Sequence, residues 1–141
     1  MRSEEGSTLL LTIFYGFLAL VLVLLVTAAT SLYLERKRLF TLADGAALVG
    51  AEAFDLQAVT VTARGARPIL ESQDVAIAVE GYLDEAPVAG FDQLRVEQAV
   101  TVDGRSATVT LSARWSPPVV SLLVPEGFPI EVTALARSVF G

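Results

Sequence analysis

The longest uncharged segment of this 141-residue chain, residues 6–34, limits what the rest of it can be. From Leu9 to Leu34 the side chains are almost all apolar. As an α-helix this part would extend about 39 Å, at ~1.5 Å per residue, and the hydrocarbon core of a bilayer is ~30 Å thick. We therefore expect a transmembrane helix over residues 7–34, preceded by a short polar N-terminus over residues 1–6.

Charged residues mark both ends of this segment: Arg2, Glu4 and Glu5 precede it, and residues 35–38 follow it as Glu-Arg-Lys-Arg. A cleaved secretory leader is the alternative, because residues 26–28 have the small side chains of a leader-peptidase site. The apolar part of a leader is usually ~7–15 residues long, however, and a charged cluster directly after it is typical of a stop-transfer signal. The pattern favours an anchor that is retained.

Two pairs of small residues lie four positions apart within the span, Thr12 with Gly16 and Thr27 with Ser31. This spacing lets two helices approach closely in lipid, so Gly16 is a candidate for helix packing. Small residues are also common in membrane helices that face lipid. The sequence leaves both interpretations open.

Composition excludes several classes of function. Ten Lys and Arg stand against sixteen Asp and Glu, a net charge of −6, so the basic surface that nucleic acid requires is missing. The chain contains no His and no Cys. Histidine is the commonest general base and metal ligand. We therefore expect no enzyme, no cofactor and no metal site.

Past the span, no helix-breaking residue follows at once, and we expect the helix to continue as a stalk over residues 35–54. Apolar and small residues recur there at intervals of three and four, on one stripe almost opposite Asp44. The stripe consists of Leu39, Leu42, Ala46, Val49 and Ala53. It suits close packing, either on the chain's own globular part or on a partner helix.

Residues 55–141 predict a single α+β head. Alternation predicts a strand over residues 57–63, a turn over residues 64–68 and a short strand at Ile69 and Leu70. Ser72 is placed to cap a helix that ends before Pro87. Its apolar positions are Val75, Val79, Tyr82, Leu83 and Ala86, and its other face carries Glu80, Asp84 and Glu85. We expect those carboxylates to be solvated.

Asp103 and Gly104 separate two alternating segments, residues 94–102 and 105–115. Asp-Gly in this position predicts a two-residue type I′ hairpin turn. The resulting register pairs Val102 with Arg105, Val100 with Ala107, Val96 with Leu111 and Leu94 with Ala113, which places apolar side chains on one face.

Apolar residues including Leu122 and Leu123 follow in residues 119–127. They would plug one end of the head, or face lipid headgroups or a partner protein. From Ile130 the chain alternates again and predicts a last strand that extends the sheet.

Three features carry a resemblance to a known family: Gly6-Ser7-Thr8 before the apolar helix, the basic residues 36–38, and an alanine-rich segment around Asp44. The positions of that segment that match are Ala43, Asp44, Ala46, Ala47 and Leu48. On these residues the chain resembles the TadE/TadG-like proteins of Flp-type (tight adherence) pilus assembly, especially actinobacterial forms.

The resemblance covers about the first third of the chain. It implies a pilin-like architecture and a membrane-anchored pilin-like or pseudopilin-like protein that assists pilus assembly or secretion. Its implied partners are other pilin-like proteins or inner-membrane platform proteins. The resemblance also implies that the head lies outside the cytoplasmic membrane.

Two observations bear on that implication. Prepilins carry a glutamate five residues after the cleavage point, where this chain has Leu11 if Gly6 precedes the cut. The resemblance then points to the uncleaved, TadG-like members. One basic residue before the span and three after it favour, by contrast, a cytoplasmic head. We expect the extracytoplasmic orientation. An anchored extracytoplasmic binding or sensor domain, with a pocket among Tyr82, Trp115 and Phe128, is the alternative function.

Overall fold

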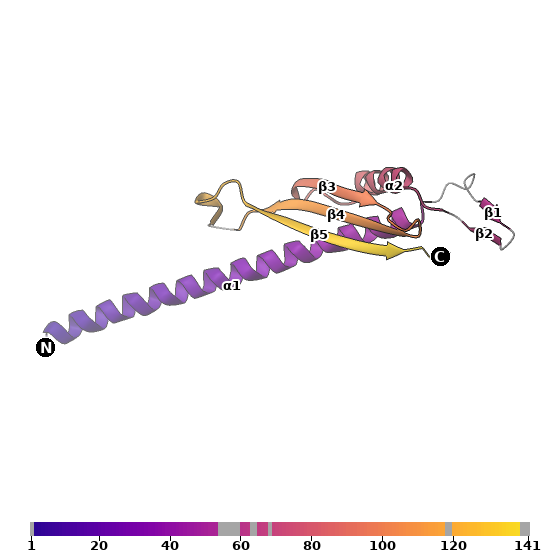
Figure 1. Cartoon of the computed structure of the whole chain (residues 1–141). Helices are drawn as coiled ribbons and strands as arrows, with labels where there is room; N and C mark the ends of the chain where they lie inside the picture. Colours follow the sequence, from indigo (N-terminus) through magenta and orange to yellow (C-terminus); the bar gives the residue numbers. More distant parts are fainter. Residues whose placement is uncertain (1, 54–59, 63–64, 68, 118–119, 139–141) are drawn as a thin grey trace. The chain divides into compact units, whose positions relative to one another are not determined.

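The computed structural model describes residues 2–53, 60–62, 65–67, 69–117 and 120–138. The chain divides into two compact units, Met1–Leu34 and Glu35–Gly141. Helix α1 (Arg2–Ala51) supplies the first unit and continues into the second (Figure 1). The long N-terminal apolar helix predicted from the sequence is thus confirmed, and it ends at Ala51, slightly before the predicted residue 54.

In the first unit, α1 is long and apolar enough to cross a membrane. Its large side chains point outward: Leu10 is 71% exposed and Phe17 is 66% exposed. Threonine hydroxyls donate to the carbonyl oxygen four residues earlier, at 2.8 Å in the pairs Thr12–Thr8, Thr27–Val23 and Thr30–Val26. These hydroxyls are therefore satisfied within the helix, as a lipid environment requires.

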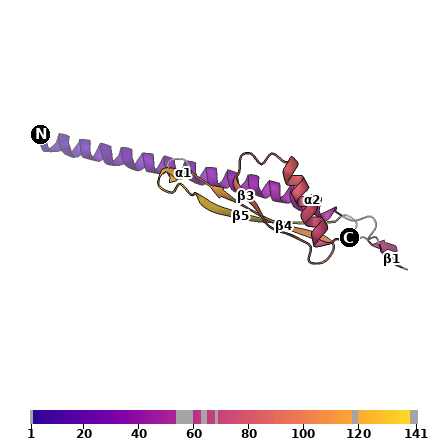
Figure 2. The ribbon, with the colours of Figure 1, turned by 90° about the horizontal axis from the view of Figure 1, so that it is seen from above.

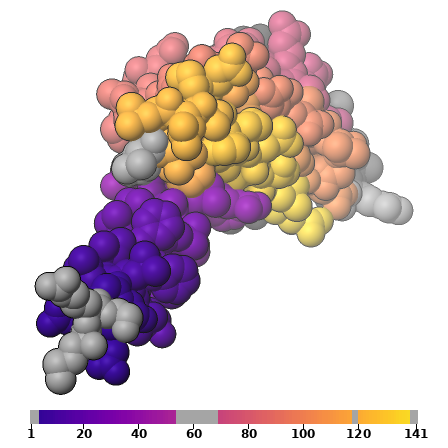
Figure 3. Space-filling model, turned by 90° about the vertical axis from the view of Figure 1, so that its left-hand side faces the viewer, coloured from indigo at the N-terminus to yellow at the C-terminus, as the bar shows by residue number. Residues whose placement is uncertain are grey.

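The second unit is α+β, as predicted. After α1 come β1 (Thr60–Thr62), β2 (Gly65–Arg67), α2 (Ser72–Glu85), β3 (Asp92–Val100), β4 (Ser106–Trp115), the short 3-10 helix η2 (Val120–Leu122) and β5 (Phe128–Arg137). Strands β3, β4 and β5 form an antiparallel sheet in that order, with β4 in the middle, and β1 pairs with β2 alone (Figures 1 and 2). The atoms of β5, an edge strand, lie at the surface in Figure 3, where they are yellow.

The core lies against one face of this sheet. Alternate residues of β4 and β5 are buried opposite one another, in the pairs Val109–Ala134, Leu111–Val132 and Ala113–Ile130. This confirms the predicted alternation of β5. Leu39 of α1 and Val75 of α2 belong to the same cluster, so both helices cover this face. The other face is mostly polar, although it also carries the exposed Leu135, and the hydroxyl oxygens of Thr110 and Thr133 lie 2.9 Å apart on it. One packed face and one solvated face are usual in antiparallel sheets.

Two glycines let α1 approach its neighbours. A Cβ on Gly50 would lie 3.1 Å from Val75 Cγ1 and 3.3 Å from Ala107 Cβ. A Cβ on Gly45 would meet the ring of Tyr82, 2.9 Å from its Cζ. Each glycine costs ~1 kcal/mol of helix propensity relative to alanine. Close packing on α2 and β4 explains why the helix contains them.

The predicted type I′ turn is wrong. Residues 101–105 separate β3 from β4, and of Asp103 and Gly104 only the glycine has a positive φ, +70°. Asp103 Oδ1 instead accepts hydrogen bonds from the backbone N–H groups of Arg105 (2.9 Å) and Ser106 (2.7 Å) and from the Ser106 hydroxyl (2.8 Å). These side-chain bonds stabilise a wider loop than the Asp-Gly pair indicates.

The predicted β3–β4 register is correct in one part only. Val96 pairs with Leu111 as expected, but Gln98 pairs with Thr110, so Glu97 is an extra residue in β3. Val100 consequently pairs with Thr108 rather than Ala107, and Val102 is 88% exposed in the loop. A bulge of this kind shifts every later pair and bends the strand.

Two predictions near the start of α2 are also wrong. The residues predicted as a turn include β2, in which Gly65 pairs with Thr62. Ile69 and Leu70, predicted as a strand, are not in one. Residues 57–59, 63, 64 and 68 of these predictions lie outside the described residues. Ser72 does not cap α2, whose N-cap residue is Glu71. The Ser72 hydroxyl donates to Thr101 O (3.2 Å) and accepts from Thr101 N–H (3.1 Å), so it joins α2 to the β3–β4 loop.

Replacing Gly50 by leucine tests the close packing of α1. Overfilling a packed core typically costs ~1–3 kcal/mol, and we expect Gly50→Leu to lower the free energy of unfolding by about that amount. Gly81→Leu is the matched control, because nothing lies within 4 Å of a Cβ at this position of α2. We expect the control to be stabilised by up to ~1 kcal/mol through helix propensity. Chemical denaturation of the full chain in micelles measures both, and equal effects would contradict the packing.

Asp103 makes the stability of the protein depend on pH. Hydrogen bonds from the backbone N–H groups of Arg105 and Ser106 and from the Ser106 hydroxyl lower its pKa from 3.8 to about 2. Because the folded pKa is depressed, this contribution is present above pH 3.8 and is lost as the pH falls through about 2. We expect Asp103→Asn to be less stable than the unmodified protein at neutral pH, and the gap to close across that window. A gap that stays constant down to pH 2 would contradict the assignment.

Candidate functional site

The stripe predicted on α1 lies mostly inside the protein's own core. Leu39 and Ala46 are fully buried and Leu42 is 7% exposed. Val49 is 36% exposed, and Ala53 is partly buried against the core. The structure therefore brings the first three together with the sheet, and contact of any stripe residue with a partner stays a prediction. Gly16 belongs to the first unit, where nothing lies within 4 Å of a Cβ built on it.

The alanine-rich segment has two faces. Ala43, Ala46 and Ala47 are fully buried, whereas Asp44 and Leu48 are exposed. Small buried residues at intervals of three and four give α1 a flat surface toward the sheet and α2. Asp44 lies on the solvent side, as expected from its position opposite the stripe.

An exposed apolar row on α1 was missed by the sequence analysis. Phe40 is 47% exposed and Leu48 is 51% exposed, and both lie on one row of the helix with Asp44 between them. Val49, which is 36% exposed, belongs to the stripe and not to this row. The signal was present in the sequence, because large apolar residues spaced by eight on the face opposite the stripe cannot enter the same core. This row presents large apolar side chains on the solvent side of α1 in the second unit.

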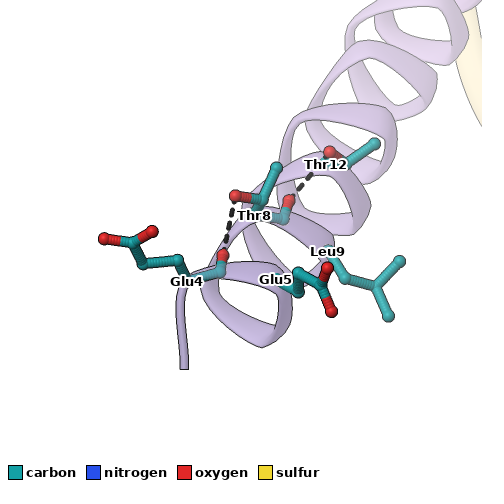
Figure 4. Close-up of a pocket in the computed structure, with 5 residues that line it drawn as sticks. All are labelled: Glu4, Glu5, Thr8, Leu9 and Thr12. Carbon is teal, nitrogen blue, oxygen red and sulfur yellow. Dashed lines mark hydrogen bonds between the residues drawn. The ribbon is translucent and has the colours of Figure 1, made fainter. Parts of the chain in front are cut away.

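The acidic residues of α2, Glu80, Asp84 and Glu85, are exposed as predicted. No group of three or more His, Cys, Asp or Glu among the described residues is placed to hold a metal ion. Figure 4 shows the first turns of α1, where the side chains of Glu4 and Glu5 extend in different directions. The Thr8 hydroxyl beside them donates to Glu4 O at 2.8 Å.

The three aromatic residues of the suggested ligand pocket serve as packing groups. Trp115 and Phe128 are cross-strand partners with ring centroids 6.1 Å apart, tilted by 40°. Tyr82 lies on α2 with its ring over Gly45. These contacts account for the three rings without a ligand and do not favour the sensor interpretation.

Comparison with known proteins gives one match. Residues 6–53 match the family model described as "Putative Flp pilus-assembly TadE/G-like". Neither the curated proteins nor the solved structures yield a match. The matched residues make up about a third of the chain and consist of α1 almost alone. The resemblance inferred from the alanine-rich segment is therefore confirmed for this part, and the match together with the apolar helix fits a membrane-anchored pilus-assembly protein.

Proposed function

We propose that the chain is a membrane-anchored, pilin-like or pseudopilin-like structural protein that assists Flp-type pilus assembly or secretion, of the actinobacterial TadE/TadG-like type. A single pass through the cytoplasmic membrane holds it, and the head lies outside the cytoplasm. One observation carries the proposal. The family match at residues 6–53 coincides with a helix that is apolar enough for the membrane and then supplies the core of the head.

The packing of α1 supports a structural role. Leu39, Ala46 and Gly50 are buried in the second unit, so the helix that leaves the membrane is part of the head's own core. A tethered binding domain is usually joined to its anchor by a flexible, polar or glycine-rich linker. Here α1 is continuous through residues 35–38, where such a linker would lie.

Partner contact is assigned to the outer side of α1. Leu39, Leu42 and Ala46 could meet a partner only if the core opened, which would expose the sheet. Phe40, Leu48 and Val49 are already exposed and apolar. We assign the contact with other pilin-like proteins or with platform proteins of the inner membrane to Phe40 and Leu48, which share one row of the helix. Gly16 would serve the same purpose within the bilayer, where a small residue permits close approach.

The orientation of the head can be tested through a cysteine, because the chain has none of its own. Val102 is 88% exposed in the β3–β4 loop, so Val102→Cys provides an accessible thiol. We expect it to react with a membrane-impermeant maleimide in intact cells whose outer layers admit the reagent. Labelling only after lysis would place the head in the cytoplasm and overturn the proposal.

Replacing Leu48 tests the contact surface. Leu48→Glu puts a charge on the exposed row of α1, and we expect co-purification of pilin-like and platform proteins, identified by mass spectrometry, to be lost. Ile77→Glu is the matched control, because Ile77 is 62% exposed on α2, away from this row. Both variants should melt like the unmodified protein, since neither side chain is buried. Equal recovery of partners with both variants would exclude the α1 row as the contact.

A further inference from the structure

The connection between β4 and β5, residues 116–127, presents two large apolar side chains to solvent. Leu122 is 84% exposed and Leu123 is 82% exposed. Glu126 is the single charged residue in the twelve positions of the connection. Adjacent, nearly fully exposed leucines in a segment of such low charge indicate a surface that is covered in the working protein.

Hydrogen bonds hold these leucines outward. Within the connection, Leu123 N–H donates to Val120 O at 2.9 Å and Val124 N–H donates to the same carbonyl at 2.8 Å. Arg114 Nη1 of β4 donates to Glu126 O at 3.2 Å, which ties the connection to the sheet. The exposure of the leucines therefore belongs to a folded turn.

A glycine closes the same turn. Gly127 has a φ of +68°, and a Cβ on it would lie 2.7 Å from both Ser116 Oγ and Trp115 O. Only glycine combines this conformation with so close an approach. The two ends of the connection are thus held together at the end of the β4–β5 ribbon.

The connection lies at the end of the second unit where α1 enters it. Gly50, near the end of α1, packs on Ala107 at the start of β4, whereas the connection follows Trp115 at the other end of that strand. From Gly50 back to residues 36–38, α1 spans roughly 20 Å, and β4 spans roughly 30 Å. Figures 1 and 2 agree that both lead to the same end, and Figure 3 shows the orange atoms of the connection on the surface there.

At that end of the second unit, the chain comes directly from the apolar segment that is expected to cross the membrane. Residues 35–38 directly follow the apolar segment, and their charges mark the level at which the helix reaches the headgroups. We propose that the β4–β5 connection inserts Leu122 and Leu123 into the interfacial layer of the bilayer that holds α1. The contact is apolar, because the connection offers no cationic side chain to lipid phosphates. It requires the membrane anchor and is independent of a role in pilus assembly.

A fluorophore at residue 123 tests this contact. The variant Leu123→Cys is labelled with the environment-sensitive dye NBD, and the purified full-length protein is reconstituted into vesicles of phosphatidylcholine and phosphatidylglycerol. Val102→Cys is the matched control, since Val102 is equally exposed but lies in the loop at the opposite end of the sheet. We expect NBD at residue 123 to emit at shorter wavelength, to be quenched by doxyl-labelled lipid and to lose quenching by aqueous iodide. NBD at residue 102 should emit at longer wavelength, should be quenched by iodide and should not be quenched by doxyl-labelled lipid.

The alternatives give different results. Iodide quenching at residue 123 equal to that at residue 102 would overturn the inference while leaving the anchor intact, provided that the protein floats with the vesicles. Failure to float would overturn the anchor and the inference together. Protection from iodide without quenching by doxyl lipid, or protection that disappears at low protein-to-lipid ratio, would mean that a second copy covers the leucines, and would also overturn it.

Discussion

The second unit depends on one contact, the packing of the last turns of α1 against the sheet and α2. Three antiparallel strands with a single helix would leave much of their apolar face in water, and a domain of this size buries too little surface to tolerate that. Ala46 and Gly50 present almost no side chain, so the helix lies close enough to shield Val75 and Ala107. The stability of the second unit therefore depends on residues of the same helix that forms the first unit.

The composition of α1 changes along its length because its two parts have different surroundings. Large apolar residues dominate before residue 35, where lipid is the expected solvent, and alanine and glycine dominate from residue 43, where the neighbours are packed side chains. Residues 36–38 lie between these parts. In lipid a large side chain gains contact with acyl chains, whereas in the head it would keep the helix away from the sheet. This division supports an anchor that is built into the head.

The sequence predicted part of the α1 contact surface and missed another part for a physical reason. Helical periodicity selected Leu39, Leu42 and Ala46, which are buried. It also selected Val49 but not the adjacent Gly50, where a Cβ would lie 3.1 Å from Val75 of α2 and 3.3 Å from Ala107 of β4. Periodicity considers the apolar side chain at each position. A glycine that permits close packing because it has no side chain is therefore not detected by periodicity. The exposed row at Phe40 and Leu48 was missed because the search followed the stripe, and this row lies on the opposite face of the helix.

The sequence by itself determined the long apolar helix, α2 and the alternating strands, because each follows from a local repeat of apolar residues that any tertiary environment would use. Only the tertiary structure decided the β3–β4 register and the start of α2. The extra residue Glu97, the Asp103 hydrogen bonds and the contact of Ser72 with Thr101, 29 positions away, are set by which polar groups find partners after packing. Such pairings between distant residues leave no periodic trace in the chain, so they appear only when the whole unit is folded.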